Sequence, residues 1–296
     1  MITKDLQNKI LSALQQQREN FTGSDAKYSI SIGINAAQYS RIKNGDTDKV
    51  LSDGQWITLA RKLGVNPNSA DEWKTANTPI FQYITTQLEL CQRESQTGLL
   101  CDRAGIGKTY TAKYYARTHK SVCYIDCSAV KTKQRLIRHI AKEFGVGSVG
   151  RFDDVYDNLV FFIKSLPTPL IILDEAGDLS YEAFLELKAF MNKIEFACGW
   201  YMMGADGLKE KIRRSIECKK VGYTEIFSRF GDRYGKVIPF DTKECERILQ
   251  ASAVMIIKAN SETADINTLL RKSVGDDNMP SLRRIYREIA KERMTV

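Results

Sequence analysis

The chain has 296 residues, of which 43% are hydrophobic and 27% are charged, and its formal net charge at pH 7 is +8. These proportions are ordinary for a soluble globular protein and exclude the disordered, collagen-like and fibrous classes. No apolar run approaches the ~18 residues of a membrane span, and the first residues resemble neither a signal nor a transit peptide, so we expect a cytoplasmic protein with no membrane partner. The positive charge favours a polyanionic partner without identifying one.

The first part of the chain, residues 1–70, carries only helical periodicity, interrupted by turn residues. Within it, residues 29–45 have the form of a helix-turn-helix. Gly33 permits a tight turn, and Asn35 is placed to cap the second helix. Three side chains would pack inward, namely Ile34, Tyr39 and Ile42. We therefore predict an N-terminal helix-turn-helix domain over residues 1–70.

The outer face of that second helix carries Gln38 and Arg41 beside two alanines. A recognition helix presents residues of this kind to a groove of DNA, so both are candidate DNA contacts. Three-helix folds of this type also dock onto other proteins, and the sequence leaves that alternative open.

Residues 71–240 alternate short apolar runs with amphipathic helices, the pattern of a parallel sheet covered on both faces. Proline and asparagine within residues 65–70 predict a linker before this part, and residues 241–296 return to purely helical patterns. The predicted class is therefore α/β, with an α/β core over 71–240 and a helical lid over 241–296. The predicted strands are 97–101, 121–125, 170–173, 200–203 and 236–240.

The first predicted strand leads into a glycine-rich loop, residues 102–109, and then into a helix. This order is what a Walker A phosphate loop requires. Its backbone N–H groups would face phosphate oxygens, Lys108 would contact the β and γ phosphates, and Thr109 would ligate Mg²⁺. Asp102 replaces the usual first glycine of GxxxxGK[ST], and we expect a lowered nucleotide affinity at most. The candidate ATP contacts are Arg103, Ala104, Gly105, Ile106, Gly107, Lys108, Thr109, Tyr110 and Asp174.

A second motif ends the third predicted strand, where the apolar residues 170–173 run into Asp174 and Glu175. Both carboxylates then lie at the C-terminal edge of the sheet, where ligands of open α/β folds bind. Asp174 would hold Mg²⁺ through water, and Glu175 would polarise the attacking water. Alone, this could be an acidic turn after a buried strand. Its position after a phosphate loop makes a catalytic pair the better interpretation.

ATP hydrolysis of this type often requires a positive charge from a neighbouring subunit. Two arginines precede the last predicted strand, where such an arginine finger would lie. Arg229 is the first choice and Arg233 the second. The alternative is that both are ordinary surface arginines. An arginine that acts in trans requires subunits that meet head to tail.

Two basic segments of the α/β part are candidate DNA contacts. The first opens a helix after the second strand, where hydroxyls, lysines and helix-end amides suit backbone phosphates rather than bases. The second follows the fourth strand. Either segment could instead be the solvated face of a charged helix. The candidates are Lys131, Thr132, Lys133 and Arg135 in the first segment and Lys209, Lys211 and Arg213 in the second.

With these motifs placed, the chain resembles the family of phage Mu transposition protein B, the target-selecting AAA+ ATPases of Mu-like transposons. The resemblance keeps the same order over nearly the full length. The phosphate loop and the acidic pair are shared by all AAA+ proteins, so its specificity rests on the domain order and on residues 227–229. The segments that carry it are 105–109, 171–176, 185–187, 202–204, 227–229 and 282–283.

The resemblance implies an AAA+ domain with a helical lid, ATP and Mg²⁺ as cofactors, and hydrolysis stimulated by DNA or by a transposase. It also implies head-to-tail helical filaments on double-stranded DNA with little sequence preference, and delivery of that DNA to a transposase. Departures from the family at two sensor positions make slow hydrolysis the expectation. Ala205 stands where a polar residue is expected, with Asp206 next to it. Pro280 stands where the lid arginine is expected, with Arg283 and Arg284 close by.

Two other functions stay open. A replication initiator or helicase loader of the AAA+ type shares the core without necessarily sharing the N-terminal part. A helix-turn-helix regulator could use the nucleotide only as an assembly switch, although a pure switch does not need Glu175.

Overall fold

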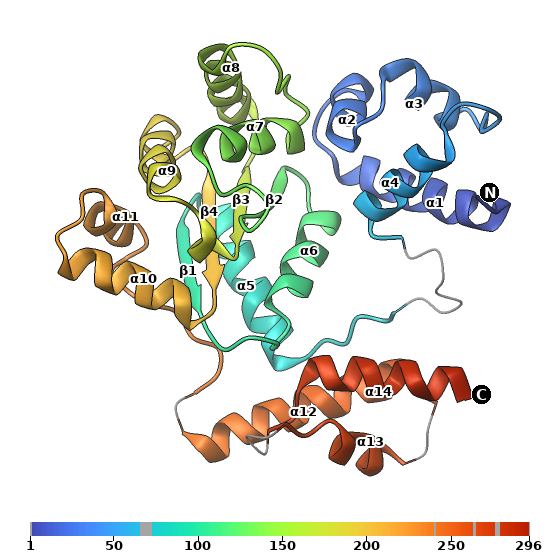
Figure 1. The fold of residues 1–296 in the computed structure, drawn as a ribbon, viewed down its shortest axis with the longest axis vertical. Coiled ribbons are helices and arrows are strands. Elements are labelled where there is room, and N and C mark those ends of the chain that lie inside the picture. The colour runs from blue at the N-terminus through green and yellow to red at the C-terminus, as the bar shows by residue number, and fades with distance from the viewer. Residues whose placement is uncertain (1, 66–72, 240, 263–264, 276–278, 296) are drawn as a thin grey trace.

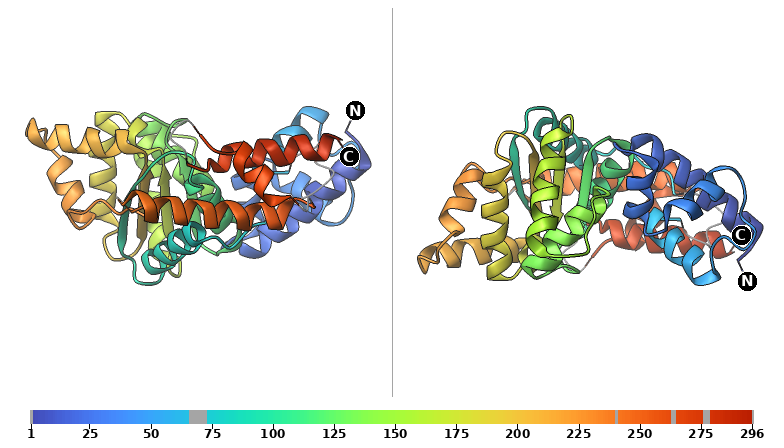
Figure 2. Two further views of the ribbon diagram at one scale, coloured as in Figure 1. Left: turned by 90° about the horizontal axis from the view of Figure 1, so that it is seen from below. Right: turned by 90° about the horizontal axis from the view of Figure 1, so that it is seen from above.

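The computed structural model describes residues 2–65, 73–239, 241–262, 265–275 and 279–295. Figure 1 shows a central sheet between helices, an N-terminal bundle of helices and a C-terminal group of helices. In Figure 2 the N-terminal bundle and the C-terminal helices lie toward the same end of the molecule, away from helices α10 (Asp206–Glu217) and α11 (Tyr223–Arg229). Within the described ranges, no helix has both the length and the apolar character that crossing a membrane needs.

The sheet consists of parallel strands in the order β1-β4-β3-β2. Cys101 of β1 lies beside Gly204 of β4, and Asp126 of β2 beside Asp174 of β3, so the carboxyl ends of the strands meet at one edge. This confirms the α/β class and the first four predicted strands. Their bounds are β1 (Thr97–Cys101), β2 (Val122–Asp126), β3 (Leu170–Asp174) and β4 (Gly199–Gly204).

Side chains alternate between the two faces of each strand. Leu99 and Cys101 belong to one core cluster, whereas Leu100 between them belongs to the other. The first cluster lies under α7 (Lys133–Glu143), α8 (Phe152–Ser165), α9 (Tyr181–Lys193), α10 and α11. The second lies under α5 (Pro79–Arg93) and α6 (Lys108–Thr118). Because both faces are covered, every residue of β3 is buried, which explains its unbroken apolar run.

The prediction of a fifth strand over residues 236–240 is wrong for the described residues 236–239; residue 240 lies outside them. Gly235 forms a single parallel bridge to the free edge of β1. The chain then leaves the sheet, because the N–H groups of Val237 and Ile238 donate to the side chain of Asp102, at 2.7 and 2.9 Å, instead of to a strand.

The N-terminal part is helical, as predicted. In α3 (Ala36–Lys43) the Asn35 side chain accepts the Gln38 N–H at 2.7 Å, and the preceding turn places Gly33 at φ +81°. The expected inward residues are buried: Ile34, Tyr39 and Ile42. The other helices of this bundle are α1 (Lys4–Asn20), α2 (Asp25–Ile32) and α4 (Asp53–Leu63). A helix-turn-helix role in DNA binding stays a prediction, and the predicted linker 65–70, apart from Val65, lies outside the described residues.

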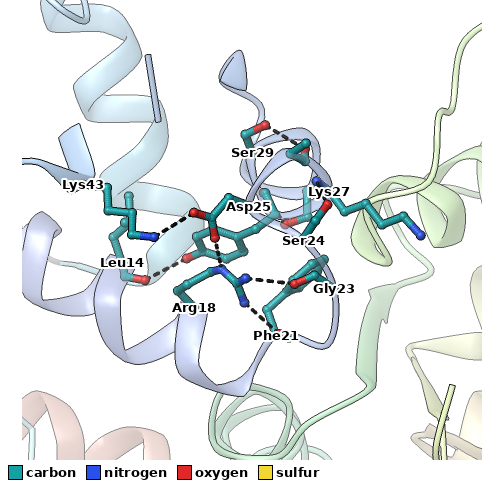
Figure 3. Close-up of polar contacts among 12 residues, drawn as sticks. Leu14, Arg18, Phe21, Gly23, Ser24, Asp25, Lys27, Ser29 and Lys43 are labelled. Atoms are coloured by element: carbon teal, nitrogen blue, oxygen red, sulfur yellow. Dashed lines mark hydrogen bonds and ion pairs between the residues drawn. The ribbon is translucent and has the colours of Figure 1, made fainter. Parts of the chain in front are cut away.

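An ion cluster joins three helices of this bundle (Figure 3). The carboxylate of Asp25 in α2 accepts hydrogen bonds from Lys43 of α3 and Arg18 of α1, both at 2.8 Å. Arg18 also donates to the carbonyls of Phe21 and Gly23, after the end of α1. The Lys43 and Arg18 hydrogen bonds lower the pKa of Asp25. Lys27 of α2 extends away from this cluster toward the α/β core.

The bundle packs directly against α6, α7 and α8. The Asn20 side chain donates to the carbonyl of Arg117, in the last turn of α6, at 3.0 Å. The ammonium of Lys27 lies 3.7 Å from the centroid of the Phe162 ring in α8. A Cβ added to Gly145, which has φ +69°, would lie 2.3 Å from the Lys27 carbonyl. The two backbones therefore meet where only glycine fits.

The C-terminal helices form their own small core. Trp73 packs on Tyr286 with ring centroids 5.0 Å apart, and Asn260 bonds both backbone groups of Lys74 at 2.8 and 2.9 Å, so the segment that enters the α/β core is held against these helices. The helices are α12 (Thr242–Asn260), α13 (Ile266–Lys272) and α14 (Leu282–Thr295). The domain boundaries at residues 70 and 240 stay predictions.

Candidate active site

The glycine-rich loop connects the end of β1 to the start of α6. Gly105 and Gly107 adopt φ +80° and +98°, a left-handed backbone that L side chains rarely adopt. Gly107 is the N-cap of α6 and offers no side chain to the first N–H groups of that helix. Those N–H groups and the positive end of the helix dipole form a binding site for an anion such as phosphate.

Lys108 is 6% exposed, and its ammonium donates to the carbonyls of Asp102 and Arg103 at 2.7 and 2.8 Å. Burial lowers the pKa of Lys108, and the charges of Asp102 and Glu175 act in the opposite direction. Its positive charge therefore lies inside the loop, in position to move to a phosphate.

The two predicted motifs meet at one carboxylate. The hydroxyl of Thr109 donates to Asp174 Oδ2 at 2.7 Å, and the hydroxyl of Tyr124 in β2 donates to the same oxygen at 2.8 Å. Hydroxyl and carboxylate oxygens, such as those of Thr109 and Asp174, are the ligands that Mg²⁺ prefers. Sequence reasoning missed Tyr124. The available signal was a tyrosine between the apolar residues of β2, near the carboxyl end of that strand.

Glu175 follows Asp174 in a left-handed conformation, φ +49°, and its N–H donates to Asp174 Oδ1 at 2.9 Å. This turn directs the two carboxylates differently: Asp174 is 1% exposed, whereas Glu175 is exposed. Burial and the Asp174 charge raise the pKa of Glu175, and Lys108 acts in the opposite direction. An exposed carboxylate beside a buried one suits a residue that contacts water.

The C-terminal helices lie over the phosphate loop. A Cβ added to Gly105 would lie 3.9 Å from Arg283, and one added to Gly107 would lie 3.9 Å from Leu282. A cavity of about 200 Å³ separates loop and lid, lined by Arg103, Ala104, Gly105 and Ile106 on one side and by Met279, Pro280, Ser281 and Arg284 on the other. The predicted nucleotide contacts 103–106 therefore face the lid. Tyr110 instead bonds Thr75 through its hydroxyl at 2.6 Å.

Residues 91–212 match the protein family described as "AAA domain". The chain contains an AAA domain. Its fold is similar to that of the Orc1 protein of Aeropyrum pernix, solved in complex with DNA (TM-score 0.51, 19% identity, 75% of this chain and 62% of that chain). It is also similar to Cdc6p of Pyrobaculum aerophilum (TM-score 0.54, 16% identity, 77% and 65%).

Two curated relatives are similar to the chain beyond the AAA domain. One is the Mu-like prophage FluMu DNA transposition protein B of Haemophilus influenzae, 24% identical over 225 residues, covering 74% of this chain and 77% of the relative. The other is the ATP-dependent target DNA activator B of Escherichia phage Mu, 21% identical over 241 residues, covering 79% and 73%. The resemblance to Mu transposition protein B is therefore confirmed.

Arg229 lies far from the phosphate loop of its own AAA domain. Its carbonyl accepts a hydrogen bond from Thr97 at the amino end of β1, and its guanidinium pairs with Glu195 at 3.2 Å. The phosphate loop follows the carboxyl end of β1, about 15 Å further along the strand. Arg229 therefore lies out of reach of the phosphate loop of its own chain, and a role at the phosphates of a neighbouring subunit stays a prediction. Arg233, the second choice, is exposed.

The candidate DNA contacts differ in the exposure of their side chains and in the contacts that these make within the protein. Lys133 and Arg135, at the start of α7, are exposed, and Lys131 is 60% exposed with Asp178 at 3.7 Å. In the N-terminal bundle, Gln38 bonds the Asn35 N–H as part of a capping box, and Arg41 pairs with Asp46 at 2.8 Å. Thr132, which caps no N–H group with its side chain, precedes α7.

In the second basic segment, more of the side chains make contacts within the protein than in the first. Lys211 donates to the carbonyls of Gly177 and Leu179, so its charge holds α10 against the turn after Glu175. Arg213 pairs with Glu210 and Glu217. Lys209 lies 5.6 Å from the centroid of the Tyr234 ring, and Asp206, at the start of α10, is exposed. A DNA-binding role for these residues stays a prediction, and the structure favours the start of α7 over α10.

Proposed function

We propose that the AAA domain hydrolyses ATP with the help of Mg²⁺. The observation that carries this proposal is the Thr109–Asp174 hydrogen bond, which joins the two sequence motifs at the carboxyl edge of the sheet. Phosphoryl transfer needs positioned positive charge and an oriented water more than covalent chemistry. Lys108, the start of α6, and Glu175 supply these elements.

In this proposal each side chain has one role. Lys108 exchanges its two carbonyl partners for the β and γ phosphates, and the N–H groups of the loop bind the same oxygens. Thr109 and Asp174 would hold Mg²⁺, and the bound ion would supply positive charge against the phosphates. Tyr124 keeps Asp174 oriented through its hydrogen bond. Glu175 orients the attacking water, and Arg229 of a neighbouring subunit stabilises the charge that develops.

We further propose that the protein assembles head to tail on double-stranded DNA, with little sequence preference, and delivers that DNA to a transposase that it stimulates. The names of the two relatives, a DNA transposition protein B and an ATP-dependent target DNA activator, support this function. The net charge of +8 and the exposed basic start of α7 suit contact with phosphates. Hydrolysis is expected to be slow in the absence of DNA or transposase.

A replication initiator or helicase loader is the second candidate, because two of the structural neighbours are Orc1 and Cdc6p. Those similarities lie below 20% identity and concern the fold alone, whereas the curated relatives described above, which match over most of the chain, are a DNA transposition protein B and a target DNA activator B. Electron microscopy of the protein with ATP on linear duplex separates the candidates. Long helical filaments support the transposition function, and small closed or cracked rings favour a loader.

Neutralising Lys131 and Lys133 together should weaken DNA binding about equally on unrelated duplexes. Contacts to phosphates release counterions, so each lost contact should make the slope of log affinity against log salt shallower by about 1. The measurement is a salt titration of binding to several labelled duplexes of different sequence, with ATP present.

The matched control is the double change of Lys164 and Lys193 to alanine. These exposed lysines end α8 and α9, at the opposite edge of the sheet, and their loss changes the net charge equally. The control should keep the parent slope. An equal loss in both double variants would show that only net charge matters and would remove the start of α7 as a DNA site.

A further inference from the structure

Asp102 occupies the position at which the phosphate-loop motif usually has glycine, and its side chain is 1% exposed. Its two carboxylate oxygens have separate partners. Oδ1 accepts the N–H of Arg103 at 2.7 Å, inside the phosphate loop. Oδ2 accepts the N–H groups of Val237 and Ile238 at 2.7 and 2.9 Å, in the segment after the bridge to β1. One buried carboxylate thus connects the loop to a distant part of the chain.

The backbone of the same residue contacts the catalytic lysine. The Asp102 carbonyl accepts a hydrogen bond from Lys108 Nζ at 2.7 Å. The N–H of Asp102 donates to the Gly204 carbonyl at 3.2 Å, which continues the β1–β4 ladder by one residue. When Lys108 Nζ donates to a phosphate instead, the Asp102 carbonyl loses its hydrogen-bond partner, while the Asp102 N–H stays bonded to β4. A change at Lys108 therefore acts on Asp102 directly.

The segment held by Oδ2 joins two functional parts of the molecule. It comes from α11, which ends at Arg229, and it leads into α12, the first helix of the lid. Ile238 is 4% exposed and belongs to the same core cluster as Ile106 of the phosphate loop and Leu249 of α12. A movement of this segment therefore acts both on α11, which ends at Arg229, and on α12 of the lid.

A glycine at position 102 could not make these contacts. The Ile238 N–H is buried, and a buried N–H without an acceptor is unfavourable, so this segment and the acidic residue depend on each other. The replacement is therefore a structural feature of the site.

We propose that Asp102 is a positioning residue that couples the hydrogen-bond partner of Lys108 to the segment 235–239, and through it to the lid and to Arg229. Nucleotide binding at the phosphate loop then changes the positions of the lid and of Arg229, which we expect to meet neighbouring subunits. The proposal rests on ATP binding at this loop and adds the route by which the rest of the subunit responds.

Two variants and a matched control test this coupling. Asp102→Asn keeps the shape but turns one acceptor into an N–H donor that faces another N–H donor, and Asp102→Gly restores the usual motif while removing both acceptors. Asp241→Asn is the control, because Asp241 lies next to the same segment and accepts the Glu244 N–H at 2.9 Å as an exposed helix cap, a role that asparagine fills equally well. Turnover at saturating ATP, the ATP dissociation constant and the melting temperature are measured for each.

We expect both Asp102 variants to lose at least about tenfold in turnover, while ATP affinity changes less than about threefold and Asp241→Asn matches the parent. A purely structural residue would lower only the melting temperature. Turnover within twofold of the parent, or a fall explained entirely by lost ATP affinity, overturns the proposal.

Amide hydrogen exchange of the unaltered protein gives a second test that needs no variant. A non-hydrolysable ATP analogue should change exchange at Val237 and Ile238 by at least about threefold and leave unchanged the Gln55 amide, which a helix cap holds in the N-terminal bundle. If the Asp102 variants do not fold, this measurement decides alone, and unchanged exchange at both amides overturns the coupling. If the parent binds the analogue but does not hydrolyse ATP, the proposed function fails while this exchange test still applies.

Discussion

Glu175→Gln is expected to bind ATP like the parent and to hydrolyse it about 10²–10⁴-fold more slowly, the range that a positioned general base contributes. Glutamine keeps the size of the side chain but cannot take a proton from water. Lys108, Thr109 and Asp174 stay intact, so the nucleotide should remain bound and trap the assembled state. Single-turnover phosphate release and binding of a fluorescent ATP analogue measure the two effects separately.

Two controls define this result. Lys108→Ala removes the charge that contacts the phosphates, so on its own it should lose ATP binding and self-assembly together, while it can still pair with a subunit that binds ATP. Glu182→Gln changes an exposed carboxylate in the first turn of α9 and should leave both measurements unchanged. A Glu175→Gln protein that hydrolyses ATP at the parent rate would show that another group orients the water.

Mixing Arg229→Ala protein with Lys108→Ala protein is expected to restore hydrolysis that neither variant shows alone. Each variant lacks one half of a shared site: the first keeps a phosphate loop, and the second keeps an arginine that lies too far from its own loop to act there. Randomly mixed neighbours at equal concentrations should recover up to about a quarter of the parent rate, because half of the subunits have an intact loop and half of their neighbours an intact arginine. Steady-state turnover across a titration of mixing ratios measures this recovery.

The Glu195 ion pair provides a matched control, because Arg229→Ala also breaks it. Glu195→Ala breaks the same pair but leaves the arginine available, so its turnover should stay within about twofold of the parent. If mixing restores nothing, and Arg233→Ala mixed with Lys108→Ala does, the role belongs to Arg233.

The sequence predicted that the two motifs of the candidate site would lie together, because both motifs are local. A glycine loop between a strand and a helix, and two acids at the end of a buried strand, each occupy one short segment, and a parallel sheet necessarily brings such strand ends together. Tyr124 and the contacts of Asp102 could not be predicted in the same way. Tyr124 reaches Asp174 from a different strand, and Asp102 bonds residues 135 and 136 positions away.

The fifth strand shows why an apolar run is an incomplete signal. Residues 236–239 have the composition of a strand, but strand formation also requires partners for the backbone. A single buried carboxylate supplied those partners instead. The basic segments make the same point for surface charge: Lys133 and Lys211 look alike in the sequence, yet one is exposed and the other bonds two backbone carbonyls.

The contact between the N-terminal bundle and α6 means that the bundle is not an exchangeable module. Asn20 bonds the last turn of α6, while the first turn of that helix forms the phosphate site, and a helix of 11 residues is a stiff rod of about 16 Å. Exchanging residues 1–70 for the DNA-binding part of another protein would uncover Phe162 and leave Gly145 without the backbone it accommodates. A lineage that acquired a new N-terminal part would have to reshape α6, α7 and α8 as well, so these two parts of the chain are expected to have been inherited together.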